Sequence, residues 1–213
     1  MRIYTAEEAP QGSVEWFELH KGLPTASEFF KVMAKVGPRG GTTGKEYVQR
    51  AQYMRMLAGE IVTDEPREPE WFGNRHTERG KEREDEARTL YAFKHDCEPE
   101  RIGFVENGNC GCSPDSFVGL GGLEIKDVLP HRQIERLQDG ALPSEHKWQV
   151  VGSLLVCEDR EWWDFVSHSR GLPLFEVRVY RDKVKSELEE LREGIDRFCA
   201  ERDRLVEWIG AMW

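Results

Sequence analysis

Residues 112–128 read CSPDSFVGLGGLEIKDV, and this stretch decides the fold. Its two ends, Cys112–Val118 and Leu123–Val128, contain branched and aromatic residues that are common in β-strands. The residues between them are mostly glycine, which is typical of a hairpin turn. The stretch therefore predicts two neighbouring strands that pair with each other.

The charged residues of this predicted hairpin indicate metal-dependent chemistry. Glu124 and Lys126 share one face because side chains alternate along a strand. If Asp115 ends the preceding strand, it lies next to Glu124, and two adjacent carboxylates call for a cation between them. Such sites favour Mg²⁺ or Mn²⁺, and the Ile125 carbonyl is a further hard ligand. Lys126 could orient and deprotonate a water if the site lowers its pKa. The alternative is a surface hairpin that carries these charges by chance, in a chain that is 33% charged.

A helix predicted over about residues 75–93 adds a third acid, Glu84. At helical spacing, Glu84 shares a face with Gly80, Ala87 and Tyr91. Because the other members of that face are small or aromatic, we expect the face to point toward the core. Glu84 is therefore a candidate for the same site rather than a solvated surface charge.

The remaining sequence predicts helices around a sheet. A capping box at Thr25–Glu28 opens a short helix to about residue 35. Other helices are expected from the glycine-rich loop at 37–44 to about 57, at 147–156 and at about 183–209, and further strands at 101–106, 163–168 and 174–180. We therefore expect one domain over residues 1–213, an α/β or α+β fold with a central mixed sheet flanked by helices.

The apolar stripe of the last helix leaves two interpretations open. Its members recur at three- and four-residue steps, with Arg202 interrupting: Val184, Leu188, Leu191, Ile195, Phe198, Leu205, Ile209 and Met212. A stripe this narrow usually packs on its own domain. A contact between subunits is the alternative.

The charge balance bears on DNA binding. A formal net charge of −10 argues at first against it, because duplex recognition needs a basic surface. The charge is uneven, however. Residues 29–59 contain one acid and six basic residues, Lys31, Lys35, Arg39, Lys45, Arg50 and Arg55, whereas residues 60–100 contain thirteen acids and seven bases. This suits a protein that binds phosphate in one place and cations in another, although ordinary solvated charge would look similar.

Other features point to a cytoplasmic protein. The five cysteines are an odd number without a zinc-like CxxC pair, which favours free thiols over a metal or redox site at Cys110–Cys112. No eighteen-residue apolar run or secretory signal is present, so no membrane association is expected. His76, His95, His131, His146 and His168 lack metal-ligand spacing and are interpreted as structural or surface residues.

Five blocks, in order, resemble the lambda exonuclease (YqaJ-like viral recombinase) family. Its three acidic motifs are similar to GKEREDEARTLYAF at 80–93, CSPD at 112–115 and LEIK at 123–126. Residues 16–27, WFELHKGLPTAS, resemble its N-terminal block, and Trp148-Gln149-Val150 followed by Trp162 resembles its glutamine-bearing helix and next strand. The blocks cover most of the chain, from Trp16 to Arg181.

The resemblance implies a PD-(D/E)xK nuclease with a restriction-endonuclease-like core. Such enzymes digest one strand of linear duplex DNA from its 5′ end and leave 3′ single-stranded tails for recombination. They usually act as a ring-shaped trimer, and a single-strand annealing protein is the expected partner. A phage or prophage origin in a bacterial host follows from the same resemblance.

The resemblance also implies residue roles. Asp115, Glu124 and the Ile125 carbonyl would hold one Mg²⁺, and Glu84 with Asp115 a second, with Mn²⁺ as a substitute. Lys126 would activate water, and Gln149 would support that water and the lysine. Two metals stabilise both the attacking and the leaving oxygen of a phosphodiester displacement.

Three further positions concern DNA. Ser27 matches the serine that the family uses around the 5′-phosphate, and an N-cap role is the alternative. His20 stands where the family commonly has an arginine. Because a neutral histidine binds phosphate less firmly than an arginine does, weaker binding of the 5′-phosphate is expected. Arg39 falls where the family has a DNA-probing arginine, with an unstructured surface arginine as the alternative.

Two other functions remain open. One is an endonuclease or end-trimming nuclease on the same core. The other is a non-catalytic DNA-binding recombination module, against which the joint presence of Asp115, Glu124, Lys126 and Glu84 argues.

Overall fold

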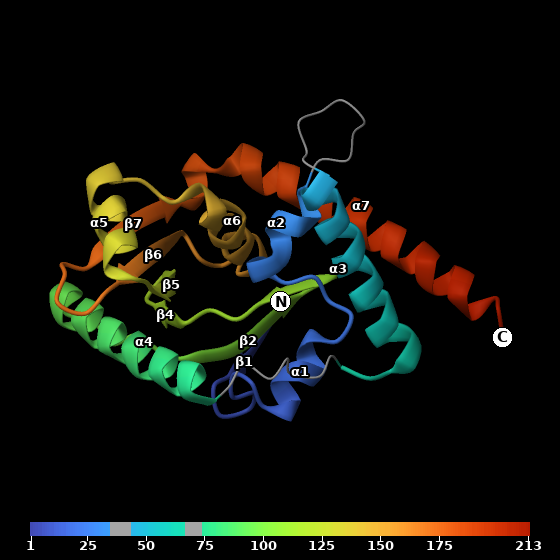
Figure 1. The fold of residues 1–213 in the computed structure, drawn as a ribbon, viewed down its shortest axis with the longest axis horizontal. Helices are drawn as coiled ribbons and strands as arrows, with labels where there is room; N and C mark the ends of the chain where they lie inside the picture. Colours follow the sequence, from blue (N-terminus) through green and yellow to red (C-terminus); the bar gives the residue numbers. More distant parts are fainter. Residues whose placement is uncertain (35–43, 67–73) are drawn as a thin grey trace.

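A mixed four-stranded sheet forms the centre of the chain in a computed structural model, which describes residues 1–34, 44–66 and 74–213 (Figure 1). The strands are β4 (Ser116–Val118), β5 (Gly121–Asp127), β6 (Trp162–His168) and β7 (Phe175–Tyr180), in that spatial order. β5 and β6 are parallel, whereas the outer pairs are antiparallel. The expected mixed sheet flanked by helices is thus confirmed.

A second, smaller sheet corrects the predicted strand at 112–118. It contains β1 (Arg2–Thr5), β2 (Ile102–Asn107) and β3 (Cys110–Cys112), in the order β1-β2-β3. The predicted strand is two strands, because β3 pairs with β2 whereas β4 pairs with β5. Pro114 stands at the break, where its missing N–H cannot continue a ladder.

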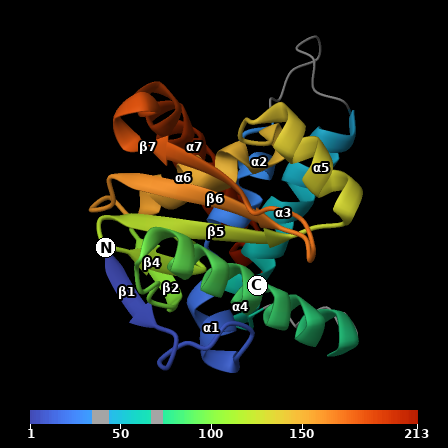
Figure 2. The same cartoon turned by 90° about the vertical axis from the view of Figure 1, so that its left-hand side faces the viewer.

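Two helices sandwich the four-stranded sheet (Figure 2). On one face, Ala87 and Tyr91 of α4 (Asn74–His95) pack against buried apolar residues of β5 and β6. On the other face, α6 (Lys147–Val156) packs with Trp163 and Phe165 of β6. The alternation of strand side chains therefore directs Leu123 and Ile125 toward α4, and Glu124 and Lys126 toward α6.

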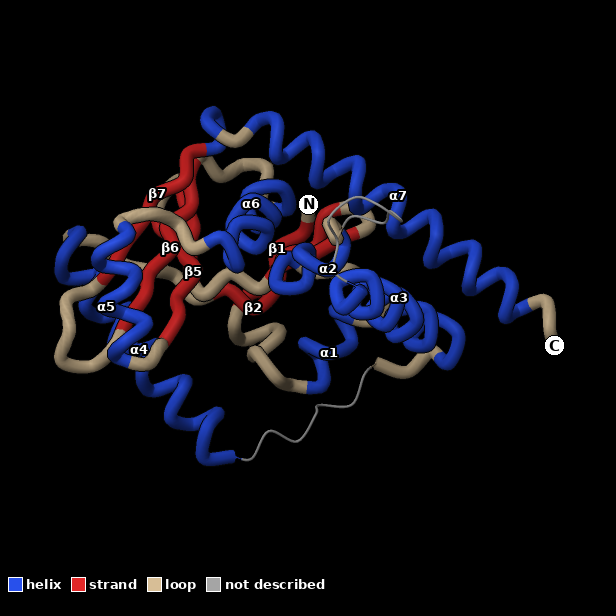
Figure 3. Tube along the Cα trace, turned by 45° about the horizontal axis from the view of Figure 1, so that its top comes forward, coloured by secondary structure: helices blue, strands red, loops and turns tan. Residues whose placement is uncertain are grey.

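The last helix, α7 (Lys185–Gly210), packs along α6 and along α3 (Gly44–Thr63). Leu191, Ile195 and Phe198 are buried, which confirms that this part of the stripe packs on its own domain. Arg202 does not simply interrupt the stripe, because its Nη1 donates to the Gly22 carbonyl at 2.6 Å. Beyond it, the helix projects away from the sheets toward the C-terminus (Figure 3).

The short elements differ most from the prediction. The capping box is wrong, because no side chain caps η1 (Ala26–Glu28) or α2 (Phe29–Val32), and Glu28 instead pairs with Lys31. α3 ends at Thr63 rather than near 57, and β1, α1 (Val14–His20) and α5 (Pro130–Asp139) were not anticipated. Single-turn elements at η2 (Ser144–His146) and η3 (Arg181–Lys183) precede α6 and α7.

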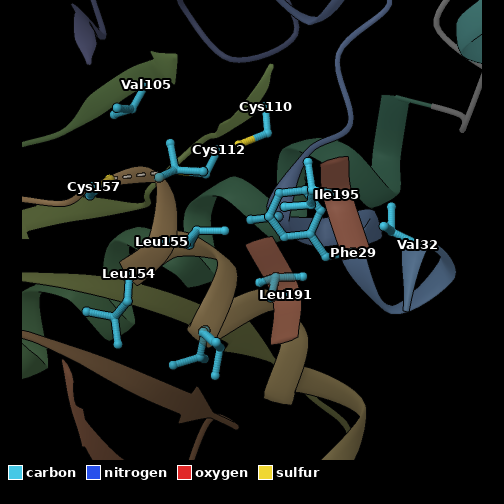
Figure 4. Packing of buried hydrophobic residues seen from close by; sticks show 14 of the residues in the cluster. Phe29, Val32, Val105, Cys110, Cys112, Leu154, Leu155, Cys157, Leu191 and Ile195 are labelled. Carbon is cyan, nitrogen blue, oxygen red and sulfur yellow. Dashed lines mark hydrogen bonds between the residues drawn. The ribbon is translucent and has the colours of Figure 1, made fainter. Parts of the chain in front are cut away.

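Close packing of η1 and α2 on α6 fixes one wall of the later site. Gly152 of α6 is essential here, because a Cβ at this position would lie 2.3 Å from the ring of Phe29. Phe29, Leu154 and Leu191 belong to the main core (Figure 4). The buried Cys112 and Cys157 thiols are 3.6 Å apart beside it. None of the described helices is long and apolar enough to cross a membrane.

Candidate active site

The hairpin between β4 and β5 brings Asp115 beside β5. Gly119, with a φ of +53°, makes the turn that other residues rarely adopt. Asp115 N donates to the Leu123 carbonyl at 3.2 Å, and Asp115 Oδ2 accepts from Ile125 N at 2.5 Å. Asp115 does not end a strand but directly precedes β4, and its hydrogen bonds place it beside β5, as the sequence predicts.

Glu124 receives two donors from the α6 side of the sheet. Lys126 Nζ lies 2.6 Å from Glu124 Oε1, and Gln149 Nε2 donates to the same oxygen at 2.6 Å. Glu124 is buried, with 3% of its surface exposed. Among the described side chains, none donates to its other oxygen, Oε2, which leaves that oxygen available to a ligand.

The electrostatics of this cluster reflect crowded negative charge. Burial, followed by the charges of Glu124 and Glu84, raises the pKa of Asp115 well above its usual range. Burial lowers the pKa of Lys126, but the attraction of Glu124 and Asp115 outweighs it and the pKa is raised. Lys126 is therefore protonated here, contrary to the lowered pKa that a general base requires. A cation that takes up the carboxylate charge would remove most of this rise.

The donor set fits such a cation. In a strand, the N–H and C=O of one residue point to the same side, so the Ile125 carbonyl faces the edge at which its N–H meets Asp115. Asp115, Glu124 and this carbonyl are all hard oxygen donors, which suit Mg²⁺. Among the described residues, no three acidic, His or Cys side chains are already gathered as a metal cage. Mg²⁺ would thus complete its shell with water or phosphate oxygens, as it usually does.

Glu84 reaches the cluster from the opposite face of the sheet. It lies close enough for its charge to raise the pKa of Asp115, but it forms an ion pair with Arg88. Arg88 also pairs with Asp85 and donates to Ser116 Oγ at 2.9 Å and to the Asp115 carbonyl at 3.3 Å. A role for Glu84 as a metal ligand would require it to release Arg88.

A cavity of about 290 Å³ opens over the α6 side of the cluster. Its residues come from α1, η1, β5, α6 and the segment after β3. Asp115, Glu124, Lys126 and Gln149 line it together with His20 and Ser27. Six of the predicted site residues thus share one cavity, whereas Glu84 is not among those that line it.

Two of the predicted DNA-binding residues occupy different environments. His20 is buried between the rings of Trp16 and Phe104, and its Nδ1 donates to the Trp16 carbonyl at 2.6 Å. Ser27 is exposed and lies inside η1, whose N-cap is Thr25, so the N-cap interpretation of Ser27 is wrong. His20 Nε2 lies 3.5 Å from Ser113 Oγ, at the cavity wall.

Comparison with known proteins agrees with this architecture. The YqaJ-like viral recombinase domain matches residues 15–160. The chain belongs to this family. It is also similar to an alkaline exonuclease, LHK-Exo, from Laribacter hongkongensis, with 27% identity and a TM-score of 0.76 over 94% of this chain and 97% of that one. The same enzyme in complex with dAMP gives 28% identity, the same TM-score and the same coverage of both chains.

A third structure shares the fold alone. It is a phage-related exonuclease from Haemophilus somnus, with 14% identity and a TM-score of 0.56 over 92% of this chain and 99% of that one. No curated protein matches the chain. The family and the alkaline exonuclease fold together support a nuclease that acts in recombination.

The basic segment of this YqaJ-family chain is only partly available to DNA. Arg50 is buried and forms a two-pronged ion pair with Glu201, at 2.8 and 3.1 Å. Lys31 pairs with Glu28 at 2.5 Å. Arg39 lies outside the described residues, as do Lys35 and the side chain of Lys45. The structure therefore assigns Arg50 to internal packing rather than to a phosphate contact.

Several residues near the site were not predicted from the sequence. Arg88 could have been recognised, because Glu84 and Arg88 have the i,i+4 spacing of a helical ion pair. Arg136 and His146 gave no such signal, since their partners are distant in sequence or lie on another element. Neither residue is among those that line the cavity.

Proposed function

We propose that this chain is a Mg²⁺-dependent 5′-to-3′ exonuclease that digests one strand of linear duplex DNA and leaves 3′ single-stranded tails for recombination by strand annealing. One observation carries the proposal. The half-buried Asp115 and the buried Glu124, with Lys126 on the same oxygen as Gln149, line a cavity that His20 and Ser27 also line. Carboxylates, a lysine and an anion-compatible wall thus share one cavity of nucleotide size.

The proposed metal ligands are Asp115, Glu124 and the Ile125 carbonyl for one Mg²⁺, and Asp115 with Glu84 for a second, with Mn²⁺ as a substitute. When bound, such ions polarise the phosphate and lower the pKa of a water. Lys126 would orient the attacking water, and it would accept the water's proton only after losing its own, which compensation of the carboxylate charge would favour. Gln149 keeps Glu124 in place through its hydrogen bond at 2.6 Å.

The polarity proposal rests on the part of the cavity lined by Ser27 and His20. Ser27 offers a hydroxyl there, and His20 Nε2 lies beside the hydroxyl of Ser113. Hydroxyl and imidazole groups bind phosphate more weakly than a guanidinium does. We therefore propose a 5′-phosphate site with a modest preference for phosphorylated ends. That LHK-Exo was solved with dAMP supports a nucleotide-sized site.

Assembly and partners are proposed from the family. A ring-shaped homotrimer would enclose the duplex, and a single-strand annealing protein in the bacterial cytoplasm would receive the 3′ tail. Arg39 is proposed to contact DNA from its glycine-rich segment. Sizing chromatography combined with light scattering tests the trimer directly, and a monomer in solution would contradict it.

End-labelled duplexes test the proposed activity. Linear duplex carrying a label at either the 5′ or the 3′ end of one strand is incubated with Mg²⁺, beside a covalently closed circle. We expect the 5′ label to be released first as mononucleotide while the circle stays intact. Cleavage of the circle would indicate an endonuclease instead. Binding without any cleavage in Mg²⁺ or Mn²⁺ would indicate a non-catalytic module.

A further inference from the structure

The connection between α1 and η1 joins two residues of the cavity. His20, the last residue of α1, and Ser27 of η1 both line the cavity, and we call the part that they line the 5′-end wall. Residues 21–24 form neither helix nor strand, so no regular element sets their position. Gly22, in the turn of this connection, is buried and has a φ of +71°, which residues with a side chain rarely adopt.

Both backbone polar groups of Gly22 are bound by buried charged side chains. Gly22 N donates to Oε2 of Glu60, on α3, at 2.6 Å. The Gly22 carbonyl accepts from Nη1 of Arg202, on α7, also at 2.6 Å. Glu60 and Arg202 are only 4% and 8% exposed, and hydrogen bonds to ionised groups are stronger than those between neutral groups. We call this pair of side chains the Gly22 clamp.

The remaining nitrogens of Arg202 are engaged as well. Its Nε and Nη2 lie 2.8 and 2.7 Å from Asp203 Oδ1, which leaves Nη1 for the Gly22 carbonyl. A buried charge is costly unless it is paired and hydrogen-bonded, and apolar side chains of similar size often fill such a space at lower cost. Two buried charges on one glycine are therefore better explained by a need for a defined geometry than by stability alone.

Further hydrogen bonds connect the clamped turn to the cavity. On one side of the turn, Leu23 N donates to the His20 carbonyl at 3.0 Å. On the other side, Thr25 N donates to Tyr53 Oη of α3 at 3.0 Å, and Thr25 pairs with Gly111 of β3. Thr25 itself lines the cavity. A shift of the clamped turn would therefore move cavity residues on both sides of it.

We propose that Glu60 and Arg202 are positioning residues for the 5′-end wall. Neither side chain is among those that line the cavity, so each acts through Gly22. Because α3 and α7 also pack on each other, they hold the turn from one common support. The proposal rests on the proposed nuclease function, since it assigns the clamped wall to the end of a DNA strand.

Substitutions that remove one hydrogen bond at a time test the clamp. Glu60→Met and Arg202→Met keep much of the side-chain volume but cannot bind Gly22. We expect each to raise KM for 5′-phosphorylated linear duplex about tenfold with kcat within about twofold, because small displacements weaken a fitted site. Glu60→Gln keeps an oxygen that accepts from Gly22 N and should retain a near wild-type KM. A purely stabilising role predicts less folded protein instead, with a lower kcat at unchanged KM.

A double-mutant cycle shows whether the two residues act through the same glycine. If they do, Glu60→Met combined with Arg202→Met should raise KM by less than about twofold beyond either single change. Arg204→Met is the matched control, because Arg204 is exposed on the same helix and its Nε donates to the Ala200 carbonyl. Multiplicative increases in KM, or a wild-type KM in folded Arg202→Met, would overturn the proposal. If Glu60→Met does not fold, Glu60→Asp replaces it, since it withdraws the carboxylate by one methylene.

NMR spectra of the protein without metal or DNA report on the wall directly. The His20 ring lies 3.6 and 4.3 Å, between centroids, from the rings of Trp16 and Phe104, so small movements relative to these rings change its signals. The signals, identified by their loss in His20→Gln, should move in Arg202→Met and stay in place in Arg204→Met.

Hydrogen exchange of the Gly22 amide completes the test. It should become roughly tenfold faster in Arg202→Met, although Arg202 binds the carbonyl and not the amide, while exchange in α6 stays as in wild type. Unchanged His20 signals and unchanged Gly22 exchange would overturn the positioning role even if the wild type is an active nuclease. The expected changes in a protein whose wild type cleaves no DNA would contradict the nuclease function instead.

Discussion

The acidic residues of the proposed site have different partners on the two faces of the central sheet, which we call the α6 flank and the α4 flank. On the α6 flank, Glu124 meets the ammonium of Lys126 and the neutral amide of Gln149, both on the same oxygen. On the α4 flank, Glu84 already forms an ion pair with Arg88. Both carboxylates thus have a cationic partner, but Lys126 is itself a residue of the proposed reaction, whereas Arg88 is fixed by further hydrogen bonds.

The difference indicates an order of binding. In the site formed by Asp115 and Glu124, burial and the neighbouring carboxylates raise the pKa of Asp115, and a bound cation would relieve this crowding of negative charge. The site that would include Glu84 must first displace Arg88, which is itself held by Ser116 and by the Asp115 carbonyl. We therefore expect the first metal to bind more tightly than the second.

Removal of a carboxylate of the first proposed metal site should have the largest effect, because Glu124 belongs to that site and Asp115 belongs to both proposed sites. Asp115→Asn and Glu124→Gln keep the size of each side chain and should lower turnover by at least about 10³-fold, since several kcal/mol of charge stabilisation is lost. Circular dichroism would verify the fold, and exonuclease assays the rate. Near-normal turnover of either folded variant would place the chemistry elsewhere.

Substitution of Lys126 should cause the next largest loss in kcat. Lys126→Met should keep DNA binding but lose roughly 10²- to 10⁴-fold in kcat, because proton transfer and water orientation are gone. Gel-shift titrations in Ca²⁺ and single-turnover rates in Mg²⁺ separate the two quantities. Lys147→Met is the matched control, since Lys147 pairs with Glu187 instead. Equal rates for the two variants would remove Lys126 from the mechanism.

Substitution of Glu84 on the α4 flank should change how the reaction rate depends on the Mg²⁺ concentration. Glu84→Gln should raise the Mg²⁺ concentration for half-maximal activity by about tenfold, whereas Gln149→Ala should lower kcat without moving this midpoint. Glu82→Gln, an exposed change on the same helix, serves as the control. If Glu84→Gln leaves the Mg²⁺ midpoint in place, the role of Glu84 is confined to its ion pair with Arg88.

Substitution of His20 should have a smaller effect, on the preference for phosphorylated 5′ ends. His20→Arg introduces a guanidinium at the cavity wall, so the ratio of rates on 5′-phosphoryl and 5′-hydroxyl duplexes should rise by about tenfold, the effect of one charge-assisted hydrogen bond. Lys21→Gln is the control, because Lys21 is already paired with Glu18 and Asp64. A ratio that His20→Arg leaves unchanged would move the 5′-end site away from this wall.

How well each region could be predicted from the sequence depends on how far apart along the chain its interacting residues lie. Alternation along β5 and a glycine turn placed Asp115 beside Glu124 correctly, because both signals are local. α5 was missed because it is mostly polar, and its buried Gln133 and Arg136 find their partners on other elements, chiefly at Ser167 of β6. The burial of His20 depends on Phe104, from a strand far along the chain. Contacts of this kind leave no period or motif in the sequence.

The smallest expected effect concerns stability and comes from His146 on the α6 flank. Its pKa in the folded chain is lowered to about 4, first by burial and then by Lys126 and Arg136, whereas an unfolded histidine titrates near 6.5. Above pH 6.5 both states are neutral and the residue contributes nothing to the pH dependence. As the pH falls from 6.5 toward 4, the unfolded chain takes up a proton that the folded chain refuses, so stability is lost over this window.

Urea unfolding at pH 7 and pH 5 measures this loss, with protein concentration fixed in case the chain assembles. Because the ring is partly exposed, we expect wild type to lose about 1 kcal/mol more than His146→Gln between these values. Asp115, whose pKa is raised, gains stability as the pH falls, but its contribution is common to both proteins and cancels in the difference. Equal losses in the two proteins would mean that His146 takes up its proton in the folded state, and a charged ring could not accept the hydrogen bond from Arg136 that sets its tautomer.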